Sequence, residues 1–276
     1  MGAVVELRHP ASRNHRWTTS PTETKPKERW LPIVDLDLPR SCSPVLASFV
    51  RRLAEEVDDE RRQLLKPYLP RLAGTARVDH ERRRAWLCID WLIRTHAPAW
   101  LQAAGDARGA ADLRALPVVR GRNTLATAAQ VLDALYAEDD PTWDPPCAAA
   151  GDPAWDAAWS MSWDVARHTA WDGPFNAAWD AARAAARVAG GEALELIFGR
   201  LRPATRDAAF TVLGAVGFEA ARQRASAVAG DYETKYEAAA DAATAALNAG
   251  IERELRPLLE RLETSALRLL LEMTIA

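Results

Sequence analysis

The sequence predicts an all-α fold, a multi-helix bundle that follows an irregular N-terminal arm. Apolar residues recur at helical spacing, and no alternating β pattern of useful length appears, except in residues 31–36. Alanine, the strongest helix former, dominates the middle of the chain. Four tryptophans recur there every eight residues, each followed by aspartate. Large rings among alanines indicate helices that pack closely on alanine faces.

The bulk composition is that of a globular chain with nearly balanced charge. Of 276 residues, 49% are hydrophobic and 26% are charged, and the formal net charge is −3 at pH 7. Such a chain can bury a core, and its charge offers no basic face for nucleic acid. No run of about eighteen apolar residues predicts a spanning helix. We therefore expect neither a nucleic-acid partner nor a membrane.

Cysteine usage and the N-terminal sequence predict a cytoplasmic location. Cys42, Cys88 and Cys147 are few, odd in number and widely spaced, which suits a reducing compartment and provides no metal-ligand spacing. Residues 1–31 contain prolines, arginines and acids but no apolar stretch of a signal peptide. No cofactor motif is present, and we expect no cofactor.

The chain divides into four segments by composition. Residues 1–40 are rich in Pro, Thr, Arg and Lys and form the expected irregular arm. Residues 41–137 form an N-terminal helical subdomain, and residues 138–153, with four prolines, form a surface loop or domain boundary. Residues 154–276 form an Ala/Trp-rich helical subdomain. The two helical segments are also compatible with one domain.

Caps, prolines and glycines predict the N-terminal helices in order. Ser43 followed by Pro44 marks a helix start, since serine caps free N–H groups and proline at the first position loses no hydrogen bond. The next helix is expected to be capped by Asp79 and, because residues 86–93 are almost all apolar, to be central. Gly105 is expected at a helix C-terminus. The helices expected after it cover 108–116 and, capped by Asn123, extend to about 137.

The Ala/Trp-rich subdomain is expected to contain several further helices. Gly173-Pro174 interrupts the tryptophan pattern, so a new helix begins there, and Gly190-Gly191 is a second stop. Pro257 falls inside the last apolar stripe and argues against one unbroken helix there. The last helices are expected over roughly 203–228, 231–249 and 251–274.

The tryptophans are the first candidates for a binding surface. Rings at i, i+4 and i+8 lie within about 80° on one helix face, and tryptophan is favoured at interface hot spots. Such rings are more often part of the core, and an aromatic cage or a contact between subunits is a further alternative. The candidate binding residues are Trp155, Trp159, Trp163, Trp171 and Trp179.

A histidine between two aspartates is a candidate for catalysis. Asp164, His168 and Asp172 are spaced i, i+4, i+8, which places an imidazole beside carboxylates, as in a general base or a metal site. No nucleophile or further type of ligand accompanies them. An ion ladder on the helix surface is therefore the favoured interpretation.

Stacked carboxylates form a candidate metal site. Glu233, Glu237 and Asp241 repeat the i, i+4, i+8 spacing, and inward-facing carboxylates bind divalent metals in helical bundles. The predicted helices lack the Glu-x-x-His of such bundles, so a solvated acidic face is favoured. The acidic run 138–140 is similar to the aspartate-rich motif of helical terpene cyclases, but Pro141 interrupts the helix that would present it.

Asp90 is the third catalytic candidate. It lies within the apolar segment 86–93, where an unpaired carboxylate is costly. Arg94 four residues later, and Arg83 or Arg84 upstream, are its expected partners. The alternative is a carboxylate kept for binding or proton transfer. His96, close by, is assigned a structural role, because no serine or cysteine constellation accompanies it.

Several short segments also carry a resemblance: CSPV (42–45), LKPYLPRL (65–72), APAWL (97–101) and the closing residues 265–273. In this order they resemble a group of alanine-rich helical proteins typical of high-GC bacteria such as actinobacteria. The resemblance implies a helical fold and assigns no catalytic residue. In its Ala/Arg-rich style the chain is also loosely similar to immunity proteins of bacterial toxin systems.

These observations predict a non-enzymatic cytoplasmic protein-binding module of the immunity, adaptor or regulatory type. Catalytic signatures are lacking, whereas tryptophan and arginine, both common at interfaces, are abundant. The expected partner is another protein or a second copy of the chain. The alternative is a metal-assisted enzyme, terpene-cyclase-like or hydrolytic, in which carboxylates of the two ladders meet in a helical cavity.

Overall fold

The first helix begins where its sequence predicts. We analysed a computed structural model, which describes residues 38–57, 59–138, 152–171, 173–185, 191–228 and 232–276. Helix α1 (Pro44–Glu56) starts with proline at its first position, and the Ser43 hydroxyl accepts a hydrogen bond of 3.2 Å from the Leu46 N–H. The predicted serine cap is confirmed.

The described residues form helices and no strand, so the all-α class is confirmed. The elements after α1 in the first half are α2 (Asp59–Arg62), η2 (Gln63–Leu65), η3 (Leu69–Leu72), α3 (Val78–Trp91), η4 (Leu92–His96), α4 (Ala97–Ala103), α5 (Ala107–Ala115) and α6 (Arg122–Glu138). Those of the second half are α7 (Pro153–Trp171), α8 (Pro174–Ala184), α10 (Gly191–Leu213), η5 (Gly214–Phe218), α11 (Glu219–Ser226), α12 (Tyr232–Gly250), η6 (Ile251–Leu255) and α13 (Arg256–Ile275).

Glycines at two helix boundaries take the left-handed conformation that favours glycine. Gly105 follows α4 with φ 91°, and Gly173 precedes α8 with φ 65°. The boundaries predicted at both positions are confirmed. The predicted aspartate and asparagine caps were wrong: α3 begins one residue before Asp79, and α6 begins one residue before Asn123. Asp79 instead lies in the first turn, where a carboxylate favours the positive end of the helix dipole.

Two prolines are accommodated within long helical runs. Helix α10 already begins at Gly191, so the start predicted near residue 203 was wrong, and Pro203 lies inside the helix. Its missing N–H leaves the Gly199 carbonyl without a helical partner, and exposure of Gly199 lets water replace it. Pro257 lies in the first turn of α13, directly after the π-helical segment η6, where the N–H is expendable.

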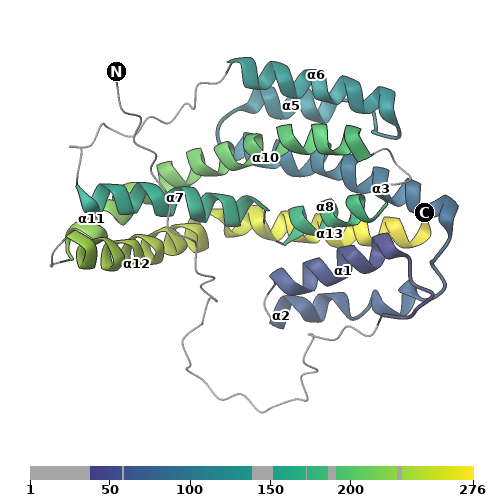
Figure 1. Cartoon of the computed structure of the whole chain (residues 1–276), viewed down its shortest axis with the longest axis horizontal. Helices are drawn as coiled ribbons and strands as arrows, with labels where there is room; N and C mark the ends of the chain where they lie inside the picture. Colours follow the sequence, from purple (N-terminus) through teal and green to yellow (C-terminus); the bar gives the residue numbers. More distant parts are fainter. Residues whose placement is uncertain (1–37, 58, 139–151, 172, 186–190, 229–231) are drawn as a thin grey trace, which may run out of the picture. The chain divides into compact units, whose positions relative to one another are not determined.

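Helices from the two halves of the chain pack on one another. Helix α8 packs against α1 and α3, and α10 packs against α4 and α6. Helix α7 packs most extensively against α12, and Figure 1 shows α7 beside α12 and α11. Small side chains make this approach possible: Ala154 and Ala157 of α7 meet Ala225 and Ala239 in one buried cluster.

Parts of the predicted organisation lie outside the described residues. These are residues 1–37 of the expected N-terminal arm and residues 139–151 of the proline-rich segment. Within the described part, none of the helices is long and apolar enough to cross a membrane.

Candidate functional site

The tryptophans of α7 pack against rings of α10. Trp155 and Trp159 stack with their centroids 5.3 Å apart, and Trp159 meets Phe210 edge-on at 4.9 Å. Trp163 stacks on the same phenylalanine at 4.0 Å. The three indoles are partly buried, whereas Phe210 is buried. These rings hold α7 to α10, and their proposed binding role stays a prediction.

The two remaining candidate tryptophans also contact α10. Trp179 is buried and stacks on Phe198 at 3.3 Å. Trp171 is partly buried, and its indole N–H donates to the Thr205 hydroxyl at 3.3 Å. Arg202 lies over the Trp171 ring, 4.4 Å from its centroid. All five tryptophans thus have ring or cation contacts within this chain.

The candidate ladder on α7 does not bring its carboxylate and imidazole together. The Asp164 carboxylate pairs with Arg167 at 3.3 Å, and the His168 Nδ1 lies 2.6 Å from the Asp164 backbone carbonyl oxygen. Both candidate side chains are exposed. Asp172 lies outside the described residues. This arrangement has the geometry of surface ion pairing rather than of a general base held by a carboxylate.

The candidate metal ligands of α12 are found on its exposed side. Glu237 and Asp241 are both exposed, and the Glu233 side chain lies outside what the structure describes. Among the side chains that are described, no group of three His, Cys, Asp or Glu residues is arranged to hold a metal ion.

Asp90 fixes a turn of the backbone. Its carboxylate lies 3.3 Å from the Arg94 guanidinium, which confirms the predicted pairing, and accepts a hydrogen bond of 2.7 Å from the Val119 N–H. Two partners therefore engage this carboxylate. Its main structural effect is to hold the segment 116–121 beside α3.

The fixed segment and α3 enclose a groove of about 430 Å³, which we call the basic groove. Helix α3 lines one side, and the segment that follows α5 lines the other. The lining residues are Asp79, Arg82, Arg83, Trp86, Leu87, Val118, Val119 and Arg120.

The basic groove presents hydrogen-bond donors that lack partners within the described structure. The exposed guanidinium groups of Arg82, Arg83 and Arg120 form no hydrogen bond or ion pair with another described residue. The Trp86 Nε1 is buried and has no hydrogen-bond partner. Asp79 is the one acidic residue in the lining. The donors and the excess of positive charge select an anionic group with acceptor oxygens.

The groove also has an apolar wall. Trp86 is 5% exposed, and Val118, opposite it in the lining, is 38% exposed and so is one of the few large hydrophobic side chains open to solvent. A site that joins an indole, aliphatic side chains and arginines has the composition of an interface hot spot.

Sequence reasoning missed this groove. Arg120 lies more than thirty positions after Arg82 and Arg83 in the sequence, and only the tertiary fold places it in the same lining. The available signal was the pair Arg82-Arg83 beside a nearly continuous apolar segment, which the sequence analysis assigned to a central helix.

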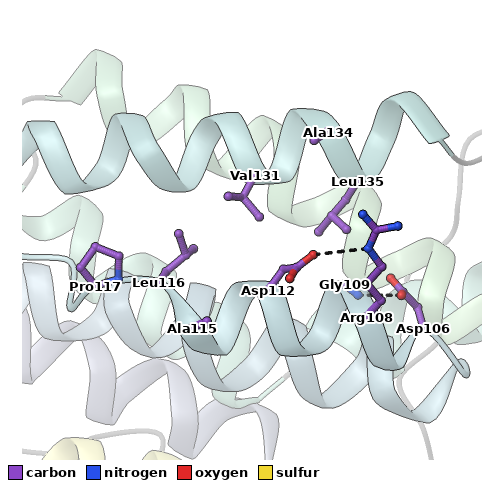
Figure 2. A pocket seen from close by; sticks show the side chains of 10 residues that line it. All are labelled: Asp106, Arg108, Gly109, Asp112, Ala115, Leu116, Pro117, Val131, Ala134 and Leu135. Atoms are coloured by element: carbon purple, nitrogen blue, oxygen red, sulfur yellow. Dashed lines mark hydrogen bonds and ion pairs between the residues drawn. The ribbon is translucent and has the colours of Figure 1, made fainter.

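A second surface groove, also about 430 Å³, lies between α5 and α6 (Figure 2). Val131, Ala134 and Leu135 of α6 face α5 across it. Its charged groups are matched: the Asp106 carboxylate accepts from the Gly109 N–H at 2.7 Å, and Arg108 lies 4.0 Å from Asp112. This groove consequently presents no set of unsatisfied groups that would select a ligand.

A comparison with protein-family models found no match, and comparisons with curated proteins and with solved structures found no significant similarity. The site must therefore be interpreted from its own geometry.

Proposed function

We propose that this chain is a protein-binding module and that the basic groove binds an acidic segment of a partner protein. The proposal rests on three arginines around an apolar groove, none of which is paired with a described residue. Exposed arginines are ordinarily screened by solvent or paired with nearby acids. Here the chain supplies one aspartate for three cations.

The chemistry of the lining defines the partner. Guanidinium groups bind carboxylates in a planar, two-bond geometry, which favours aspartate and glutamate side chains. The Trp86 indole adds an aromatic surface to the lining. Leu87 and Val118 add apolar contact area. The matching ligand is a peptide segment in which acidic residues flank an aliphatic one.

A direct test measures binding of a fluorescent peptide that alternates glutamate and leucine, with a lysine–leucine peptide of equal length as the comparison. We expect the acidic peptide to bind and its affinity to weaken with added salt. The triple variant R82E/R83E/R120E should lower this affinity by at least about tenfold.

The control is the triple variant R224E/R261E/R268E, which changes the net charge equally at exposed arginines outside the groove. It should bind the acidic peptide nearly as well as the unaltered chain. An equal loss of affinity in both triple variants would mean that overall charge alone determines binding, and it would contradict the proposal. Tighter binding of a single-stranded oligonucleotide than of the acidic peptide would contradict it as well.

A further inference from the structure

A smaller cavity of about 250 Å³ lies where the C-terminal ends of α1 and α7 meet the starts of α8 and η6. We call it the His96 cavity. Its lining combines apolar side chains with two carboxylates, one guanidinium and a buried imidazole, among them Val57, Ile251, Leu262, Glu56, Glu263, Arg61 and His96.

His96 contributes an unsatisfied acceptor to this cavity. Its side chain is 2% exposed and packs between the rings of Trp91, at 5.4 Å, and Phe175, at 5.0 Å. The ring forms a hydrogen bond with the backbone of Ala170, near the end of α7, where helical carbonyls lack internal partners. The Nδ1 atom has no hydrogen-bond partner among the described residues.

The protonation of His96 determines what Nδ1 can do. Burial lowers the pKa of this imidazole to about 3, so the ring is neutral at physiological pH. A neutral imidazole has one N–H, and the bond to the Ala170 carbonyl uses it. Nδ1 therefore carries a lone pair that can accept a hydrogen bond.

Two carboxylates of the same lining add acceptor capacity to the cavity. Glu56 pairs with Arg52 at 2.8 Å, Glu263 pairs with Arg61 at 2.8 Å, and each acidic side chain is 19% exposed. An ionised carboxylate accepts about four hydrogen bonds, so an ion pair leaves it able to accept more. Arg61 lines the cavity as well, so these carboxylates serve there as hydrogen-bond acceptors rather than as a source of net negative charge.

The cavity lies beside two departures from regular helix geometry. His96 is the last residue of the π-helical segment η4, and Ile251 is the first of the π-helical segment η6. π-Helical turns are often found at functional sites.

We propose that the His96 cavity binds a small organic ammonium ion. Its N–H groups donate to His96 Nδ1 and to the carboxylates of Glu56 and Glu263, and its apolar part packs on Val57, Ile251 and Leu262. A volume of about 250 Å³ accommodates a small ligand such as a short alkylamine. This site is separate from the basic groove, and neither proposal depends on the other.

The test titrates the full chain with butylamine, butyrate and butanol near neutral pH and follows the nitrogen NMR shift of His96 Nδ1. We expect butylamine alone to move that resonance in the direction of an accepted hydrogen bond. Calorimetry should give a saturable affinity for butylamine. Equal effects from butyrate or butanol, or no response to butylamine, would overturn the proposal.

Two variants connect the binding to the cavity. His96→Phe keeps a ring between Trp91 and Phe175 but removes Nδ1, and Glu56→Gln removes one charge while His96 stays in place. Each should weaken butylamine binding by about tenfold. The control is Glu55→Gln, since Glu55 contacts the same Arg52 at 3.5 Å but is exposed and does not line the cavity. If His96→Phe fails to fold, the butylamine affinities of Glu56→Gln and Glu55→Gln still test the proposal. Equal affinities of these two variants would overturn it.

Discussion

The guanidinium of Arg202 lies over the indole of Trp171, with its Cζ atom 4.4 Å from the ring centroid. The same Cζ is 4.6 Å from the centroid of Phe198, which in turn stacks on Trp179. One arginine of α10 thereby connects rings of α7 and α8. Burial lowers the pKa of this guanidinium, which nevertheless stays charged because arginine ordinarily titrates far above neutrality.

Replacing Arg202 with methionine should reduce the free energy of unfolding by about 1–2 kcal/mol. Methionine retains an unbranched apolar stem over the rings and removes the cation that faces their π-electrons. Urea denaturation measures the change. Arg224→Met is the control, because Arg224 is exposed on α11 and has no ring beneath it, so its effect should stay below about 0.5 kcal/mol. Equal effects of the two substitutions would contradict a cation–π contribution.

Trp159→Ala should destabilise the protein by about 3 kcal/mol. The indole stacks on Trp155 and contacts Phe210, so its removal leaves a cavity between α7 and α10. Because the Trp159 indole is partly exposed, the expected loss of stability is at the low end of the range for removing a large ring. Trp159→Phe, which keeps a ring, should cost about 1 kcal/mol. An unchanged melting temperature combined with loss of a protein partner would instead identify Trp159 as an interface residue.

Much of the fold could be predicted because its signals are local. The Ser43 cap, the left-handed Gly105 and the break at Gly173 each depend on neighbouring residues and were predicted correctly. The start of α10 was predicted incorrectly. Packing against α4 and α6 keeps the chain helical through Pro203, although local propensity opposes a helix there. Tertiary contacts decided that boundary.

The candidate sites could be predicted far less well, because they join distant residues. Arg82 and Arg120 line one groove although they are far apart in the sequence, and for Asp90 the sequence predicts an ion pair but not the hydrogen bond from Val119. The unsatisfied Nδ1 of His96 follows from its contacts with α7 and α8. Spacing within one helix contains no information on such contacts.

Arg84 is buried in a network that should be sensitive to the loss of either charge. It is 1% exposed, donates to Glu81 at 2.9 Å and donates to the backbone carbonyls of Thr75 and Met273, both at 2.8 Å. Arg84→Met would leave the buried Glu81 carboxylate without its cation and two carbonyls without their donor. We expect a loss of about 3–5 kcal/mol in the free energy of unfolding.

A double-mutant cycle separates the pair from its surroundings. Glu81→Gln with Arg84→Met should be less destabilising than the sum of the two single changes, because the double variant leaves no unpaired buried charge. Denaturant titration of the four proteins gives the coupling energy. Strict additivity would contradict a direct interaction between Glu81 and Arg84.

The lowered pKa of His96 predicts that the protein loses stability as the pH falls. The folded-state pKa is about 3, below the ordinary value of 6.5, so the unfolded chain binds the proton more readily between these values. The contribution of the neutral ring is complete above about pH 6.5 and declines progressively toward pH 3. One pKa unit corresponds to about 1.4 kcal/mol, so acidification to pH 5 should cost about 2 kcal/mol.

Urea denaturation between neutral pH and pH 5 tests this slope, and the His96→Phe variant is the comparison because its ring cannot bind a proton. The variant should start less stable, since the Ala170 backbone loses its hydrogen bond to the ring, but its stability should fall less steeply with acid. Carboxylates common to both proteins cancel in the difference between the two curves. Parallel curves would contradict a lowered pKa of His96 in the folded protein.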